Sequence, residues 1–150
     1  MNIVLCVGNS MMGDDAAGIM LYEMLNKNPL PNWQALNGGS TPENQVHTIR
    51  QLKPECLVIV DATEMDLPVG EIRFVDKALI ADMFIMSTHN LPLNFLIEQL
   101  EEDIPSVHFI GIQPDIVSFM FPMTEPVKQG VTTIYDALKN WENGPHFASL

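Results

Sequence analysis

Short apolar runs, each ending at polar or glycine residues, alternate along this chain with segments whose apolar residues recur at helical spacing. Residues 3–7 (IVLCV) and 56–60 (CLVIV) contain no charged or amide side chain, which is typical of strands buried on both faces of a parallel sheet. Helices between such strands form right-handed crossovers that cover both faces of the sheet. The alternation therefore predicts an α/β fold of three layers, with helices on both sides of a mainly parallel sheet.

The same pattern predicts five strands and four helices. Residues 71–75 alternate polar and apolar side chains, which is typical of a strand with one face in water, so we expect an edge strand running antiparallel to its neighbour. The residues after Trp141 show no periodicity and are predicted to be loosely ordered. The predicted strands are residues 3–7, 33–36, 56–60, 71–75 and 107–112, and the predicted helices are residues 19–25, 42–52, 91–100 and 125–141.

Length and composition limit the possible functions. The chain has 150 residues, so residues 1–150 are predicted to form a single domain. Seven basic and nineteen acidic residues give a net charge of −12, which repels phosphate backbones and disfavours nucleic acid as a partner. No apolar stretch reaches the roughly 20 residues that cross a membrane, and the first residues lack the basic segment of a signal peptide. We therefore expect a cytoplasmic protein without membrane contact, in which Cys6 and Cys56 are buried free thiols.

Polar residues stand where the predicted parallel strands end, at the sheet edge where such proteins bind ligands. Asp14 and Asp15 follow the first strand, and Asp61 follows the central strand. Gln113 follows the last strand, and His89 precedes the third helix. Two carboxylates and one imidazole from separate loops would give two oxygen ligands and one nitrogen ligand to a divalent metal ion, with coordination positions left for a substrate.

Each of these residues also has an ordinary structural interpretation. An aspartate before a helix is commonly its N-cap, so one of Asp14 and Asp15 is expected to cap the first helix. Asp61 would accept backbone N–H bonds in the loop after its strand, and His89 would be a surface or capping residue. The pattern does not decide which aspartate of the pair would bind a metal. The metal-site hypothesis depends on the joint placement of the three groups at one sheet edge.

Several other kinds of site are disfavoured because required residues are missing. The glycines at positions 8, 13 and 18 do not form the GxGxxG pattern of dinucleotide-binding loops. A phosphoaccepting receiver domain needs a lysine after its last strand, and Gln113 occupies that place. No Ser-His-Asp set is evident, Cys6 lies inside a predicted strand, and the HExxH signature is absent. A nucleophilic protease and a zinc protease of the HExxH type therefore have no support.

Four motifs taken together resemble those of the hydrogenase maturation endopeptidases. They are VGNSMMGDD at residues 7–15, VDATEM at 60–65, STHN at 87–90 and GIQPD at 111–115. Three further segments bring the chain nearest to the branch that processes large subunits of formate-hydrogenlyase-type hydrogenases: GGSTPEN at 38–44, LPLNFLIEQL at 91–100 and FPMTEPVK at 121–128. The resemblance covers nearly the whole chain, with the motifs in order.

This resemblance implies a fold, a substrate and a set of site residues. The family's fold is similar to a five-stranded twisted sheet between helical layers. Its members remove a short C-terminal extension from the precursor of a nickel–iron hydrogenase large subunit that already holds its metal. The family's three metal-contacting positions correspond by motif to Asp15, Asp61 and His89. One departure is Ala16, where relatives often carry glycine; alanine is compatible with the first turn of a helix.

The resemblance also implies a mechanism and a partner. Nickel would be supplied by the precursor, so no tightly bound cofactor is expected, and the ion would polarise the scissile carbonyl or activate water. Met11, Met12 and Gly13, beside the acidic pair, and Gln113 are predicted to contact the substrate; alternatively, the methionines pack on neighbouring helices. A second interpretation of the chain is a non-enzymatic, nickel-dependent maturation chaperone that binds the loaded large subunit without cutting it.

Overall fold

The computed structural model describes residues 1–82 and 93–150 of the chain. Within them, five strands form one sheet with helices around it. The strands are β1 (Asn2–Val7), β2 (Trp33–Gly39), β3 (Cys56–Ala62), β4 (Ile72–Phe74) and β5 (Ser106–Ile112). The helices are α1 (Ala17–Lys27), α2 (Val46–Leu52), α3 (Lys77–Asp82), α4 (Leu93–Glu101) and α5 (Glu125–Lys139), with 3-10 turns η1 (Gly13–Ala16), η2 (Pro42–Gln45) and η4 (Trp141–Asn143).

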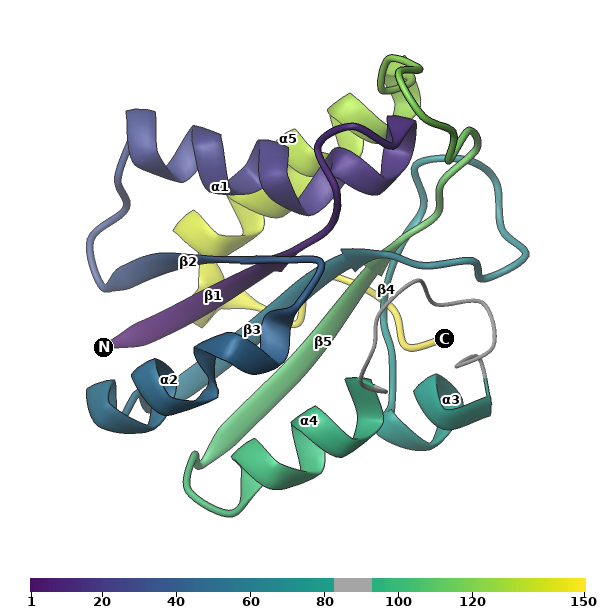
Figure 1. Cartoon of the computed structure of the whole chain (residues 1–150). Coiled ribbons are helices and arrows are strands. Elements are labelled where there is room, and N and C mark those ends of the chain that lie inside the picture. Colours follow the sequence, from purple (N-terminus) through teal and green to yellow (C-terminus); the bar gives the residue numbers. More distant parts are fainter. Residues whose placement is uncertain (83–92) are drawn as a thin grey trace.

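The central strand of the sheet is β3, and the strand order is β2-β1-β3-β5-β4 (Figure 1). β1 pairs in parallel with β2 and β3, and β3 pairs in parallel with β5. The short edge strand β4 runs antiparallel to β5, with Ile72 opposite Ile112. The predicted fold class, a mainly parallel five-stranded sheet with one antiparallel edge strand, is therefore confirmed. Because β1, β3 and β5 are parallel, the loops that follow them leave the same edge of the sheet.

Two apolar layers cover the sheet, because successive side chains of each strand point to opposite faces. On one face, Val4, Val58 and Ile110 pack against the apolar sides of α1 and α5. On the other face, Leu5 and Ile59 pack with α2, α3 and α4. Figure 1 shows α1 and α5 together on one side of the sheet and the three other helices on the opposite side. Full burial of each such side chain contributes about 1.5–3 kcal/mol, which holds both helical layers on the sheet.

Three local features differ from the sequence prediction. The predicted helix at 42–52 is divided into η2 and α2, and helix α3 was not expected from the pattern. The C-terminal residues are ordered, so the prediction of a loose tail after Trp141 is wrong. Phe74 N–H donates to the carbonyl of Ala148 at 2.9 Å, and Leu150 N–H donates to the carbonyl of Phe74 at 2.9 Å. These bonds, with ring contacts of Phe74 to Trp141 and Phe147, fix the tail along the free side of β4.

Two further expectations concern the membrane and the thiols. In residues 1–82 and 93–150, no helix combines the length and the apolar character needed to cross a membrane. Cys6 and Cys56 are both buried and both carry free thiols, as predicted.

Candidate active site at the carboxyl edge of the sheet

The loop after β1 brings the acidic pair back against the ends of the strands. A Cβ atom on Gly18, in the first turn of α1, would lie 2.2 Å from the carbonyl oxygen of Val7 and 3.0 Å from that of Val60. Only glycine permits so close an approach of helix to strand. A Cβ atom on Gly8 would likewise lie 2.2 Å from the carbonyl oxygen of Asp15. These contacts place η1, which carries both aspartates, beside the end of β3.

Asp14 is fully buried, and its carboxylate binds a distant loop of the chain. Its Oδ2 accepts the backbone N–H groups of Asp115 at 2.8 Å and Ile116 at 3.3 Å. Its Oδ1 accepts the backbone N–H of Thr124 at 2.7 Å. The hydroxyl of Thr124 lies 3.0 Å from Oδ1 and 2.8 Å from Oδ2. The carboxylate therefore fixes residues 115–124 above the carboxyl edge of the sheet.

This arrangement changes the interpretation of the acidic pair. The N-cap positions of η1 and α1 are Met12 and Ala16, and both aspartates lie inside the 3-10 turn. The prediction that one of them caps the first helix is therefore wrong. Both oxygens of Asp14 are committed to hydrogen bonds within the chain, which makes Asp14 a structural carboxylate. Asp15, which corresponds by motif to a metal-contacting position of the family, is 7% exposed.

Asp61 lies one residue before the end of β3 and is 4% exposed. It is paired in the sheet with Gly111 of β5, which fixes its backbone on that side. The loop that follows begins with Thr63, whose N–H donates to the carbonyl of Ile112 at 2.9 Å. Two aspartates, Asp15 and Asp61, are thus buried at the same edge of the sheet. Buried carboxylates are rare unless they are paired, hydrogen-bonded or bound to a cation.

Gln113 joins the two loops that follow β3 and β5. Its side-chain oxygen accepts the backbone N–H groups of Met65 at 2.7 Å and Leu67 at 3.3 Å. Its amide nitrogen donates to Glu64 at 2.9 Å and to the carbonyl of Pro114 at 3.0 Å. The side chain is 3% exposed, so these bonds shape the edge around Asp61. Direct contact of Gln113 with substrate stays a prediction.

The remaining predicted site residues are placed as follows. Met11 is exposed, Met12 is half-buried, and Gly13 is buried with a left-handed φ of 58°. A Cβ atom on Gly13 would lie 2.3 Å from the carbonyl oxygen of Ile116, so this glycine permits the contact between the two loops. His89 lies outside the described residues. Among the residues that are described, no group of three His, Cys, Asp or Glu side chains is arranged to hold a metal ion.

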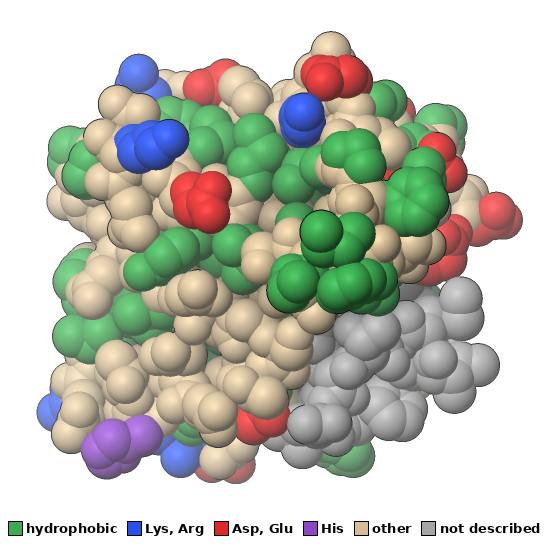
Figure 2. Space-filling view, turned by 45° about the horizontal axis from the view of Figure 1, so that its top comes forward, with side chains coloured by type: hydrophobic (Ala, Val, Ile, Leu, Met, Phe, Trp, Pro, Cys, Tyr) green, Lys and Arg blue, Asp and Glu red, His purple; other side chains and the backbone are tan. Residues whose placement is uncertain are grey.

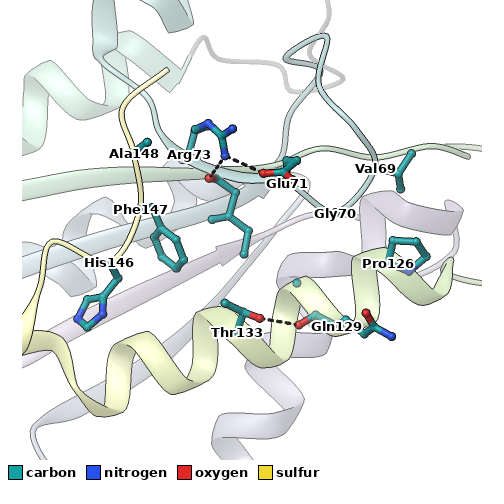
Figure 3. A pocket seen from close by; sticks show the side chains of 12 residues that line it. Val69, Gly70, Glu71, Arg73, Pro126, Gln129, Thr133, His146, Phe147 and Ala148 are labelled. Atoms are coloured by element: carbon teal, nitrogen blue, oxygen red, sulfur yellow. Dashed lines mark hydrogen bonds and ion pairs between the residues drawn. The ribbon is translucent and has the colours of Figure 1, made fainter.

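A pocket of about 470 Å³ lies beside the carboxyl edge, between β4, the start of α5 and the C-terminal tail (Figure 3). Arg73 donates to the Glu71 carboxylate at 2.9 Å and to the carbonyl of Ile72 at 2.8 Å, and His146 of the tail also lines the pocket. The lining residues do not include Asp15 or Asp61. The pocket is therefore separate from the candidate site.

A serine–histidine pair lies at the other end of β5. Ser106 Oγ and His108 Nε2 are 2.8 Å apart, and the imidazole ring lies against Phe74 and Trp141. Burial lowers the pKa of His108. Because this end of β5 is opposite to the loops that carry Asp15 and Asp61, the pair belongs to the aromatic packing around the tail.

The buried thiols are expected to be unreactive. Burial raises the pKa of Cys6 well above its usual range. It also raises the pKa of Cys56, against the lowering effect of hydrogen bonds with Ser106 and Trp141. Because the thiolate is the nucleophile, iodoacetamide at pH 8 should add no mass to the native protein and should modify both cysteines in urea. Inactivation of the native protein by alkylation would contradict this prediction and restore a cysteine mechanism.

The structure is that of an α/β protein with two buried carboxylates, Asp15 and Asp61, at the sheet edge where proteins of this class bind their ligands. The sequence model of the hydrogenase maturation proteases matches residues 19–141 of the chain. The chain belongs to the hydrogenase maturation protease family, and it is an endopeptidase by this membership.

Individual relatives agree with this assignment. The chain is 56% identical over 149 residues to the hydrogenase 3 maturation protease of Escherichia coli strain K12, a match that covers 99% of this chain and 96% of the relative. The solution structure of the endopeptidase HycI from Escherichia coli is 55% identical, with a TM-score of 0.93 over 100% of this chain and 96% of that one. A [NiFe] hydrogenase maturation protease, HycI, from Thermococcus kodakarensis is 28% identical, with a TM-score of 0.81 over 93% of this chain and 90% of that one.

Proposed function

We propose that this protein removes the C-terminal extension from the nickel-loaded precursor of a nickel–iron hydrogenase large subunit. The observation that carries the proposal is the pair of buried carboxylates, Asp15 and Asp61, at the carboxyl edge of the sheet in a member of this protease family. The partner is the large-subunit precursor, and the net charge of −12 argues against nucleic acid. We place the reaction in the cytoplasm, where the thiols of Cys6 and Cys56 stay reduced.

In this proposal, Asp15, Asp61 and His89 bind the nickel ion of the precursor. Two carboxylates and one imidazole suit a borderline divalent cation. Burial of two like charges at one edge is unfavourable by itself, and a cation that arrives with the substrate offsets the repulsion. The metal ion in the precursor would polarise the scissile carbonyl or activate the attacking water.

The same ligand set explains why the metal belongs to the substrate. Tight structural metal sites use four protein donors, commonly thiolates, and this set offers three donors without sulfur. Such a site holds a free ion weakly, so productive binding needs the precursor and its nickel together. Metal binding and precursor binding then favour each other, which makes nickel insertion the condition for cleavage.

The test is incubation of the purified protein with nickel-loaded and nickel-free precursor, followed by intact-mass analysis of both proteins. We expect loss of the C-terminal extension only from the nickel-loaded precursor, and elemental analysis should find the isolated protein nearly free of metal. A protein that retains stoichiometric metal through chelation and cuts nickel-free precursor would contradict the proposal. Binding of loaded precursor without any cleavage would instead identify a maturation chaperone.

A further inference from the structure

Large apolar side chains gather on the two loops above the carboxyl edge. Among the described residues, five of the eight exposed large apolar side chains belong to these loops. Figure 2 shows hydrophobic groups standing out from this side of the molecule, with acidic groups beside them. We name this cluster the apolar knob. Its members and exposed fractions are Met11 (49%), Val117 (37%), Phe119 (64%), Met120 (70%) and Phe121 (53%).

The backbone holds the apolar knob in one conformation. Met120 N–H donates to the carbonyl of Met11 at 2.8 Å, which joins the two loops, and Asp14 N–H donates to the carbonyl of Ile116 at 2.7 Å. The carboxylate of Asp14 holds both ends of residues 115–124. Met120 adopts a left-handed φ of 66°, a conformation that costs a residue with a Cβ atom about 1–2 kcal/mol. Strain of this kind is retained where the position of a side chain matters.

Folding alone does not explain these side chains. The knob residues are exposed, so they contribute little to the hydrophobic core, and loops with a purely connecting role usually carry small polar residues. Apolar clusters that remain exposed on soluble domains commonly mark a surface for another macromolecule. Phenylalanine and methionine are among the residues enriched in protein–protein interfaces, and methionine adapts its shape to a partner.

The charge of the surroundings restricts the partner. The charged residues that flank residues 117–121 in the chain are Asp115 and Glu125, both exposed, and Glu125 forms an ion pair with Lys128 at 3.4 Å. The whole chain carries a net charge of −12. A complementary surface therefore has an apolar centre and a rim of lysine and arginine. The net negative charge of the chain opposes docking of a second copy of it, or of an anionic surface, on the knob.

The knob also adjoins the candidate site. Asp14, which fixes residues 115–124, is the neighbour of Asp15 in the same 3-10 turn. A macromolecule docked on the knob would thus lie next to the buried carboxylates. We propose that the apolar knob is the docking surface for the folded body of the large-subunit precursor, and that its partner patch is apolar with a basic rim. The inference rests on the proposed function and adds to it a recognition site separate from the scissile segment.

The test compares the affinities of four proteins for immobilised nickel-loaded precursor: wild type, Phe119→Asp, Phe119→Leu and Phe95→Asp. Phe119→Asp should bind at least about tenfold more weakly, as expected for an interface hot spot, and should raise KM in cleavage assays. Phe119→Leu keeps an apolar side chain and should stay within about threefold of wild type. Phe95, on α4, is 56% exposed and lies outside the knob. Phe95→Asp therefore measures the effect on binding of replacing an exposed phenylalanine by aspartate elsewhere on the surface. Binding by the wild type should weaken as salt is raised.

Several outcomes separate docking from catalysis. Wild-type affinity in Phe119→Asp, or equal losses in Phe119→Asp and Phe95→Asp, would overturn the docking surface and leave the proposed cleavage intact. Precursor that binds through the knob without being cut would refute the proposed cleavage and leave the docking surface intact. A dimer of this chain that Phe119→Asp dissociates, seen by light scattering, would assign the knob to a second copy and overturn the proposal. Unchanged thermal melting of Phe119→Asp establishes that folding is unaffected.

Discussion

If Asp61 contacts the metal of the precursor as proposed, Asp61→Asn is expected to slow removal of the C-terminal extension by at least about 100-fold, more than the 10–100-fold cost of losing a supporting residue. Asparagine has the shape of aspartate but lacks the charge that would bind the nickel of the precursor. Asp61 lies in the ladder between β3 and β5, and its backbone pairing does not depend on the side chain. The fold should therefore persist. Asp15→Asn and His89→Ala are expected to act in the same direction. The measurement is the initial cleavage rate by intact-mass analysis.

A matched control for this change is Asp66→Asn in the loop after β3. Asp66 is exposed and has a left-handed φ of 57°, a conformation that asparagine also adopts readily. The control therefore removes one carboxylate near the site without burial or backbone strain, and the cleavage rate should stay close to wild type. If Asp61→Asn is folded and cleaves as fast as Asp66→Asn, the assignment of Asp61 to the metal site fails.

Periodicity was sufficient to predict the sheet. Residues 3–7 and 56–60 are apolar throughout because both faces of those strands are covered, and the structure places them in β1 and β3. Polar and apolar residues alternate at 71–75, which predicted an edge strand with one face in water. In the structure, β4 is less buried than β1 and β3. Placement of Asp15 and Asp61 at one edge then followed from parallel pairing alone. Local pattern determines these features, so a single sequence is enough to predict them.

Contacts between distant segments were not predictable in this way. The order of the tail comes from bonds between Phe74 and residues 148 and 150, and nothing in the composition of the tail signals a strand partner. The hydrogen bonds of the Asp14 and Gln113 side chains to distant loops were not predictable either. Asp14 binds residues about 100 positions away along the chain, so the two adjacent aspartates look equivalent in sequence and differ only in the fold. The contact of the Thr124 hydroxyl with Asp14 is likewise one that local pattern does not predict.

Asp14→Asn is expected to destabilise the protein by about 2–4 kcal/mol, which is roughly 10 °C in Tm for a domain of this size. Both carboxylate oxygens of Asp14 accept backbone N–H groups, Oδ1 from Thr124 and Oδ2 from Asp115. An asparagine has one acceptor oxygen, so its NH₂ group must face a donor in either orientation and leave that donor unsatisfied. Replacing the buried, charged carboxylate by a neutral amide would by itself raise the stability, because it removes the cost of burying a charge. The lost hydrogen bonds dominate because the carboxylate is already fully compensated by donors.

Thr124→Val separates the contribution of the Thr124 hydroxyl from that of the backbone N–H groups that bind Asp14. The Thr124 side chain makes no capping bond to α5, so valine removes only the hydroxyl contacts with Asp14 and keeps the backbone N–H bond. The cost should be about 1 kcal/mol, well below that of Asp14→Asn. Urea denaturation of both variants and the wild type measures the difference.

Because Asp14 also fixes residues 115–124 and with them the apolar knob, Asp14→Asn should raise KM for the precursor as well. Equal stability of Asp14→Asn and wild type would show that the carboxylate does not hold this loop, and would return Asp14 to the candidates for the metal site.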